Sequence, residues 1–314
     1  MPLFLNRPYR AWLLALCLFF SAMLPLQAAP LLDGTSRIAV MSAFEPELAL
    51  LKERLQHPAS FSVNGVEFST GLLEGHSVVL LLSGISMVNA AMNTQLVLDR
   101  FNVSHIVFSG IAGGVNPGLN IGDVTVVERW GQYLEVLMAR EITPGVFDTQ
   151  LLDGEEPFPN FGMAFTRPVE VRSKSDSAPI RKFWFDVDPT MLKVSRQLDG
   201  QSLDACDDQR QCLDHTPRIV VGGNGVSGSA FVDNAALREH LYNSFSANVL
   251  DMESAACAIV AYANSVPFIA FRSLSDLAGG GDGANEMHTF LNLAARNSAH
   301  VLLSFLERWK PGHE

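Results

Sequence analysis

Four apolar runs, each ending in small or polar residues, constrain what this chain can fold into. They are RIAVMSAFEPE (37–47), SVVLLLSGIS (77–86), HIVFSGIAGG (105–114) and VPFIAFRSLSD (266–276). A nearly continuous apolar run is typical of a strand in a parallel sheet that is covered on both faces. Because ligands of open α/β sheets bind beyond the carboxyl ends of the strands, the polar tails are expected to converge on one cleft. The candidates for that cleft are Glu47, Ser83, Gly113, Glu253 and Asp276.

Segments with helical periodicity alternate with these runs. The predicted helices cover residues 46–55, 87–101, 234–245, 252–264 and 286–309, and further strands are expected within 121–127 and 218–231. This alternation predicts a doubly wound α/β unit. Between about residues 130 and 217 the pattern weakens into clusters of Pro, Gly, Asp and Ser, which indicates an insertion on the surface of the same domain or at a subunit contact.

The negative net charge of the chain limits the classes of molecule that it is expected to bind. A formal net charge of -11 and a pI of about 5.2 argue against nucleic acid or an anionic membrane surface as the main partner. A small-molecule ligand fits better. The glycine run at 278–283 lacks the Lys and Ser/Thr of a phosphate-binding Walker loop, so we expect a mobile lid there rather than a nucleoside triphosphate site.

The first 28 residues have the pattern of a secretory signal peptide. Arg7 and Arg10 precede the apolar stretch AWLLALCLFFSAMLPL, and LQA (26–28) offers a small-residue cleavage site. The apolar core is short for a spanning helix. We therefore expect a mature chain of residues 29–314 that is periplasmic or secreted, with no stable membrane anchor.

Three cysteines remain after the predicted cleavage. An oxidising compartment would allow Cys206 and Cys212 to close a small disulfide loop, whereas Cys257, in a helical stretch, is expected to be a buried small hydrophobe. The cysteines do not have zinc-ligand spacing with histidines. We predict no metal site and no cofactor.

Six motifs carry a resemblance to a known family. They are SAFEPEL (42–48), LLSGIS (81–86), FSGIAGG (108–114), VSGSAFV (226–232), DMES (251–254) and SLSD (273–276). In their order and spacing, the chain resembles the nucleoside phosphorylase and nucleosidase superfamily, and within it the 5′-methylthioadenosine/S-adenosylhomocysteine nucleosidases. The resemblance implies a single domain with a twisted mixed, largely parallel sheet flanked by helices, a homodimer, and hydrolysis of the N-glycosidic bond of adenine nucleosides. Secreted plant bark-storage proteins of the same superfamily also resemble this chain in their signal peptide and long middle insertion.

The resemblance implies roles for three carboxylates. Asp276 would protonate N7 of the departing adenine, which requires a raised pKa. Glu47 would activate water against C1′ of the ribose, and Glu253 would accept hydrogen bonds from the two ribose hydroxyls. Each also has a structural interpretation: a helix N-cap for Asp276, a first-turn glutamate for Glu47, and for Glu253 a buried ion pair whose local partner is not evident.

The same resemblance implies the apolar and backbone contacts to the substrate. Phe231 and Val232 would stack on the purine and contact it through the backbone, and Met252 would pack against the sugar. Ser83 and the amides around Gly113 would position the water or the ribose. Phe44 and Met287 would line an apolar slot for a 5′-thioether group.

Two other functions remain open. A purine nucleoside phosphorylase must hold a phosphate dianion, which ordinarily requires arginine, yet residues 42–48 and 107–114 contain none. Arg272 is then the candidate. The other function is a secreted nucleoside-binding or storage protein that has lost turnover, against which the presence of all three acids argues. Water is the favoured nucleophile.

Overall fold

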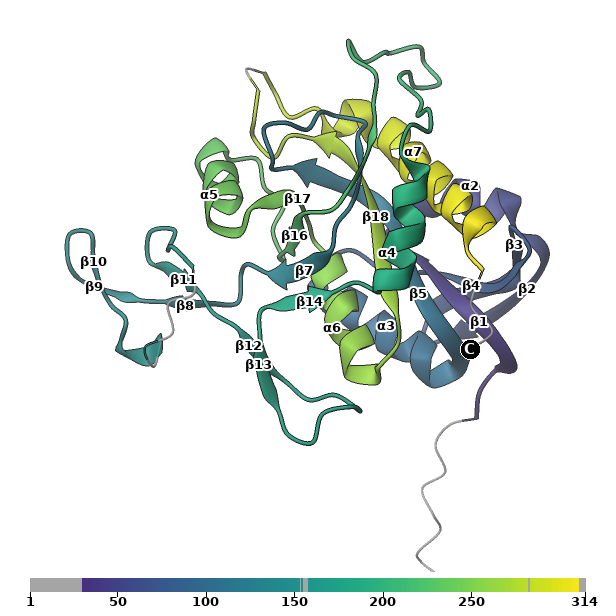
Figure 1. Cartoon of the computed structure of the whole chain (residues 1–314), viewed down its shortest axis with the longest axis horizontal. Coiled ribbons are helices and arrows are strands. Elements are labelled where there is room, and N and C mark those ends of the chain that lie inside the picture. Colours follow the sequence, from purple (N-terminus) through teal and green to yellow (C-terminus); the bar gives the residue numbers. More distant parts are fainter. Residues whose placement is uncertain (1–29, 153, 155–157, 282, 311–314) are drawn as a thin grey trace, which may run out of the picture.

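A mixed sheet forms the centre of the computed structural model, which describes residues 30–152, 154, 158–281 and 283–310 (Figure 1). The predicted signal peptide lies outside the described residues. The strands of the sheet are β1 (Asp33–Ser42), β2 (Gln56–Val63), β3 (Val66–Leu73), β4 (His76–Leu82), β5 (Phe101–Gly114), β6 (Val124–Val126), β7 (Arg129–Gln132), β14 (Trp184–Asp186), β15 (Ile219–Val221), β16 (Asn224–Ser227), β17 (Ala247–Asp251) and β18 (Phe268–Asp276). Together with the flanking helices they form one α/β domain, as the resemblance implied.

The four strands predicted from apolar runs are neighbours in this sheet. β1 lies between β4 and β5 and is parallel to both, and β18 is parallel to β5 on its other side. Their carboxyl ends therefore meet at one edge. The end of β5 also pairs antiparallel with β17, which brings the residues after β17 to the same edge.

Helices cover the sheet in two pairs. α2 (Glu45–Arg54) packs against α7 (Met287–Arg308), and α3 (Met87–Arg100) packs against α6 (Ser254–Asn264); the pairs lie on either side of β5 and β18 in Figure 1. The remaining helices are α4 (Pro189–Ser195) and α5 (Ala235–Phe245), with 3₁₀ turns at Gln150–Leu152 and Arg196–Leu198. The five predicted helices are confirmed. Among the described residues, no helix is long and apolar enough to cross a bilayer.

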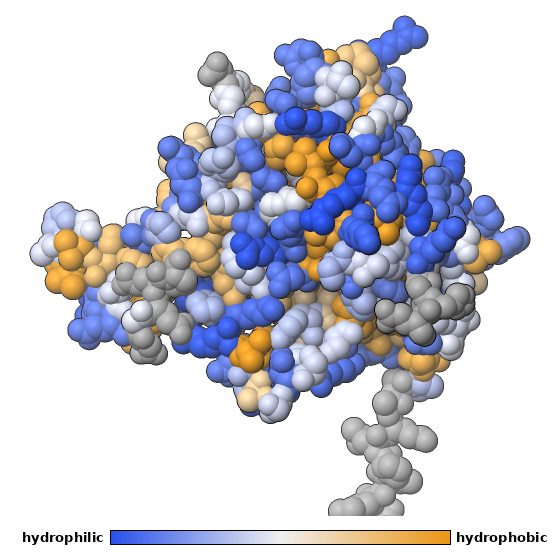
Figure 2. Space-filling view, in the orientation of Figure 1, coloured by the Kyte–Doolittle hydropathy of each residue, from blue (hydrophilic) through white to orange (hydrophobic). Residues whose placement is uncertain are grey.

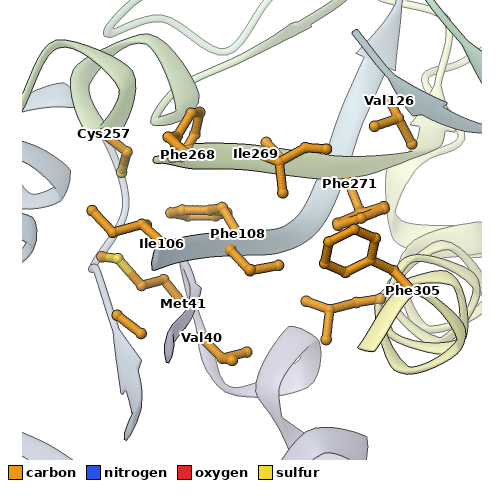
Figure 3. Close-up of a cluster of buried hydrophobic side chains, with 14 of the residues drawn as sticks. Val40, Met41, Ile106, Phe108, Val126, Cys257, Phe268, Ile269, Phe271 and Phe305 are labelled. Atoms are coloured by element: carbon orange, nitrogen blue, oxygen red, sulfur yellow. The ribbon is translucent and has the colours of Figure 1, made fainter. Parts of the chain in front are cut away.

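The main core fills the space between the sheet and these helices. Figure 3 shows side chains of β1, β5 and β18 interdigitating with Phe305 of α7 and Cys257 of α6. Phe108, Phe271 and Phe305 are fully buried, and each contributes roughly 1.5 to 3 kcal/mol by leaving water. Cys257 is buried, as predicted.

The segment 130–217 differs in part from the predicted surface insertion. β7, β14 and α4 belong to the core, because Trp130, Phe185 and Met191 are fully buried. Its middle projects from the body as an arm in which β8 pairs with β11 (Figure 1). Figure 2 shows apolar residues on this arm. The small sheets of this middle part are formed by β8 (Val136–Met138), β9 (Arg140–Thr143), β10 (Val146–Asp148), β11 (Ala164–Thr166), β12 (Val169–Val171) and β13 (Ile180–Lys182).

A disulfide joins Cys206 to Cys212 in the loop before β15. The pairing that the sequence allowed is therefore formed in the structure. The bridge lies beside α7, where Arg296 donates to the backbone carbonyl of Cys206 at 3.2 Å.

Candidate active site

A cavity of about 250 Å³ opens at the carboxyl ends of the central strands. It is lined by the last residues of β5, β17 and β18, by residues that follow β1, β4, β16 and β17, and by the first turns of α7. All of the predicted site residues except Ser83 line it, namely Phe44, Glu47, Gly113, Phe231, Val232, Met252, Glu253, Asp276 and Met287. The topology thus gathers residues that are up to 243 positions apart, from Phe44 to Met287.

Glu47 is held by backbone amides from two strand ends. Its Oε2 accepts from the Ala43 amide at 2.7 Å, while its Oε1 accepts from the Ile111 amide at 2.7 Å. The side chain is 1% exposed, so it does more than favour the start of α2. Burial raises the pKa of Glu47, and the nearby guanidinium of Arg272 opposes this shift. The amides orient the carboxylate, and a raised pKa makes it a stronger base, which suits a general base.

Asp276 ends β18 with its carboxyl group against Gly113 of β5. Oδ1 accepts from the Ala278 amide at 2.8 Å and Oδ2 accepts from the Ser275 hydroxyl at 2.9 Å. A Cβ at position 113 would lie 3.3 Å from Oδ1, so glycine leaves the carboxyl group room. Asp276 is not a helix N-cap, because α7 begins only at Met287. Burial raises its pKa, while the hydrogen bonds it accepts oppose the shift.

Glu253 joins a buried ionic cluster beneath the cavity. Its Oε1 accepts from the Ser86 amide at 2.8 Å, and its Oε2 lies 3.5 Å from Nη2 of Arg272. Burial raises the pKa of Glu253 to about 7, against the opposing effect of Arg272. The ion-pair partner that the local sequence did not reveal is therefore an arginine of β18.

Arg272 is fully buried, and its guanidinium contacts several protein groups. Its Nε lies 2.8 Å from Oδ2 of Asp251, although that N–H points at the Ser254 hydroxyl at 3.0 Å. Nη1 donates to the carbonyl of Ile111 at 3.2 Å, and the guanidinium lies 4.3 Å from the centre of the Phe108 ring. Arg272 is thus committed to the protein and does not line the cavity, which argues against the phosphate-binding role considered for it.

Asp251 is a member of this cluster to which the sequence analysis gave no role of its own. Its Oδ1 accepts from the Ser227 hydroxyl at 2.5 Å and from the Ser254 amide at 3.1 Å, which ties β16 to the start of α6. The available signal was Arg272 itself. A charge inside an otherwise apolar strand requires a buried partner, and the two carboxylates of the DMES motif, Asp251 and Glu253, were candidates.

Ser83 does not contribute to the cavity. Its amide continues the ladder with β1 by donating to Ser42, and its buried hydroxyl donates to the carbonyl of Gly84 at 2.9 Å. Gly84 then turns the chain with a φ of +75°, so that Ile85 reaches the cavity instead. Among the residues predicted for the site, Ser83 is therefore the one that the structure places outside the cavity wall.

The rest of the cavity wall is apolar. Phe231 is 55% exposed at the rim, whereas Val232 is buried. Ile85, Met252, Met287 and Leu291 add aliphatic surface. Within the described residues, no group of three or more acidic, His or Cys side chains is placed to hold a metal ion.

The fold and the cavity together define a class. Residues 37–307 match the family model of the phosphorylase superfamily, and the chain belongs to this superfamily. Among curated proteins, it is 30% identical over 279 residues to the 5′-methylthioadenosine/S-adenosylhomocysteine nucleosidase of Bacillus cytotoxicus, covering 87% of this chain and all of that one. The enzyme of the same name from Mycobacterium bovis is 29% identical over 272 residues, with 86% and 96% of the chains covered.

Solved structures show the same similarity. The 5′-methylthioadenosine/S-adenosylhomocysteine nucleosidase of Colwellia psychrerythraea, in complex with adenine, superposes with a TM-score of 0.66 at 25% identity, covering 88% of this chain and 97% of that one. Futalosine hydrolase of Helicobacter pylori superposes with a TM-score of 0.63 at 20% identity over 87% and 98% of the chains. The second match shows the shared fold alone.

Proposed function

We propose that the protein hydrolyses the N-glycosidic bond of adenine nucleosides, such as 5′-methylthioadenosine or S-adenosylhomocysteine, and releases adenine. One observation carries the proposal: Glu47, Glu253 and Asp276 come from separate strand ends and line one cavity. The names of the two curated relatives reported above give these nucleosides as their substrates.

The leaving group needs an acid, and Asp276 supplies it. Adenine is a poor leaving group as an anion and a better one once N7 is protonated. The proton passes from Asp276 to N7, the bond between C1′ and N9 breaks, and its electron pair stays with the base. Burial raises the pKa of Asp276, which favours the protonated acid, and general acid catalysis of this kind contributes about 10² to 10⁴ in rate.

Glu47 serves the nucleophile. The carboxylate takes a proton from water as the water oxygen bonds to C1′. Backbone amides fix both of its oxygens, so the attack geometry is set before substrate arrives. Glu253 then accepts hydrogen bonds from the ribose hydroxyls, with Met252 against the sugar ring.

The apolar walls are proposed to bind the two ends of the substrate, the purine base and the 5′ group. Phe231 and Val232 form the base side, where an aromatic face and backbone groups suit a purine. Phe44 and Met287 face a region that also includes Ile85 and Leu291. A 5′-thioether gains more from such a surface than a free hydroxyl does.

Water is favoured over phosphate as the nucleophile. No arginine or lysine is among the residues that line the cavity, and Arg272 behind it is already paired. A phosphate dianion would enter without a cation to balance it.

The test is incubation of the protein with 5′-methylthioadenosine, with and without inorganic phosphate. We expect equal adenine release in both, with 5-methylthioribose as the second product. Release only with phosphate, with a sugar 1-phosphate as product, would establish the phosphorylase instead. Binding without release, measured by calorimetry, would establish the storage protein.

We also propose that the protein acts as a homodimer. Val88 and Met92 are 76% and 56% exposed and lie four residues apart on one face at the start of α3, and Ile85, which precedes the helix and lines the cavity, is 51% exposed. Such an apolar surface is typical of an interface. Light scattering on the purified protein is expected to give twice the chain mass, and a monomer would contradict the proposal.

The proposed location is the periplasm or the exterior of the cell. The N-terminal motif supports it, and the bond between Cys206 and Cys212 suits an oxidising compartment. N-terminal sequencing of the protein from its native host is expected to begin at Ala29. An intact Met1 terminus in the cytoplasmic fraction would contradict this location.

A further inference from the structure

We propose that Asn285 is a positioning residue for Asp276, holding its carboxyl group so that the transferable proton resides on Oδ2. This inference rests on the proposed function, because it assigns the geometry of the acid in that reaction. Asn285 lies between the glycine run and α7, outside the six motifs, and it does not line the cavity.

The side-chain amide of Asn285 is fixed at its oxygen end. Oδ1 accepts from the Met287 amide at 2.9 Å, at the first residue of α7. Nδ2 must therefore face the other way, where it lies 3.4 Å from Oδ1 of Asp276 and 3.2 Å from Oδ1 of Asp233. Asn285 thus connects the start of α7 to the acid and to the segment before α5.

The donors around Asp276 distinguish its two oxygens. Oδ1 receives the Ala278 amide and Nδ2 of Asn285, and neither donor can accept a proton in return. Among the described residues, Oδ2 receives only the Ser275 hydroxyl, whose oxygen also lies 3.4 Å from the carbonyl of Ala112. Because that hydroxyl can rotate to the carbonyl, Oδ2 is the oxygen that is free to carry the proton.

Asp233 and Asn285 act on Asp276 in opposite directions. The negative charge of Asp233 raises the pKa of Asp276, whereas the Asn285 donor stabilises the anion and lowers this pKa. The other groups at this edge are engaged elsewhere or lie outside hydrogen-bond reach of Asp276. Those groups are Glu47 and Glu253 across the cavity, Arg238 of α5, which donates to Gly114, and Glu286 and His288 at the start of α7.

Two substitutions separate this role from a structural one. Asn285→Ser keeps a short side-chain acceptor for the Met287 amide but cannot reach Asp276. Asp233→Asn removes the repelling charge. The experiment measures kcat for adenine release from 5′-methylthioadenosine across pH, with the thermal unfolding midpoint as the folding control.

The alkaline limb of kcat reports loss of the Asp276 proton. We expect this limb to move to higher pH in Asn285→Ser and to lower pH in Asp233→Asn, with kcat of Asn285→Ser also falling roughly 2- to 10-fold, as for one lost hydrogen bond. Asn102→Ser, at an exposed asparagine that donates only to Gly34, is the matched control and should leave the profile unchanged.

The outcomes also distinguish this inference from the proposed function. If wild-type protein releases no adenine, the proposed function fails first. If wild-type protein is active and both variants keep the wild-type limb, or both shift in the same direction, Asn285 has no positioning role while the function stands.

Discussion

At the residue scale, the proposed reaction depends on buried carboxylates with different tasks. Glu47, Glu253 and Asp276 are all at most 5% exposed, yet only Glu253 has a cation as a hydrogen-bond partner. Their environments therefore separate the roles. Glu47 is surrounded by amides, Glu253 is paired with Arg272, and Asp276 lies beside a second carboxylate, Asp233.

The pH dependence of turnover follows from two of these groups. Glu47 must be ionised to act as a base, and burial raises its pKa, so kcat should fall on the acid side as Glu47 takes up a proton. Asp276 must be protonated, so kcat should fall again on the alkaline side. We predict a bell-shaped profile in wild-type protein.

Glu47→Gln tests the acid limb. The amide cannot accept the proton of water, so turnover should drop by about 10² to 10⁴ and the residual rate should lose its acid limb. Stopped assays of adenine release across pH measure this. A variant with near-normal turnover, or with the acid limb retained, would remove Glu47 from the reaction.

Much of the site could be predicted at this scale, and the failures have physical causes. The three acids were identifiable because each follows an apolar run or lies in an apolar helical context. For the partners of Arg272 the sequence carried only an indirect signal, a charge inside an apolar strand, since Asp251 and Glu253 lie at another strand end and local periodicity does not reveal pairing across a sheet. Ser83 lies outside the cavity wall because its amide still pairs with β1 and its hydroxyl donates to the carbonyl of Gly84, a local arrangement that the motif alone does not reveal.

At the element scale, the long strand β5 positions the site. Its first part pairs with β1 and β18, and its glycine-rich end approaches Glu47, Arg272 and Asp276 closely. The parallel strands were predictable from continuous apolar runs. The hairpin of β2 and β3 was not, because β2 is mostly exposed and lacks such a run.

Gly110→Ala tests the closeness of this approach. An added Cβ would lie 2.3 Å from Nη1 of Arg272 and 2.6 Å from Oε1 of Glu47. Both groups must move, so we expect loss of most turnover together with a destabilisation of about 1 to 3 kcal/mol by urea unfolding. Gly34→Ala is the matched control, because no atom lies within 4 Å of its added Cβ. Equal activity of the two variants would show that the close contact is not needed.

At the scale of the whole molecule, the buried acids lower the free energy of unfolding as pH rises toward neutrality. A carboxyl group whose pKa is higher in the folded than in the unfolded state stabilises the fold below its unfolded pKa and loses that contribution as pH rises. For Glu253 this window runs from 4.5 to about 7, which corresponds to about 3 kcal/mol.

Glu253→Gln should flatten this dependence. Between pH 4.5 and 7, we expect the difference in unfolding free energy between the variant and wild type to rise in favour of the variant, because the amide has no proton to lose. Urea unfolding at several pH values measures the difference. Glu53→Gln, at an exposed glutamate of α2, is the control. Parallel curves for wild type and Glu253→Gln would mean that Glu253 is not the source of the dependence.

The central claim is that Asp276 protonates the departing base within a folded, substrate-competent site. The most direct measurement compares wild-type protein and Asp276→Asn in single turnover with 5′-methylthioadenosine, with binding measured in parallel. We expect the variant to fold and to bind the nucleoside but to release adenine at least about 10²-fold more slowly. Near-normal adenine release by Asp276→Asn would contradict it.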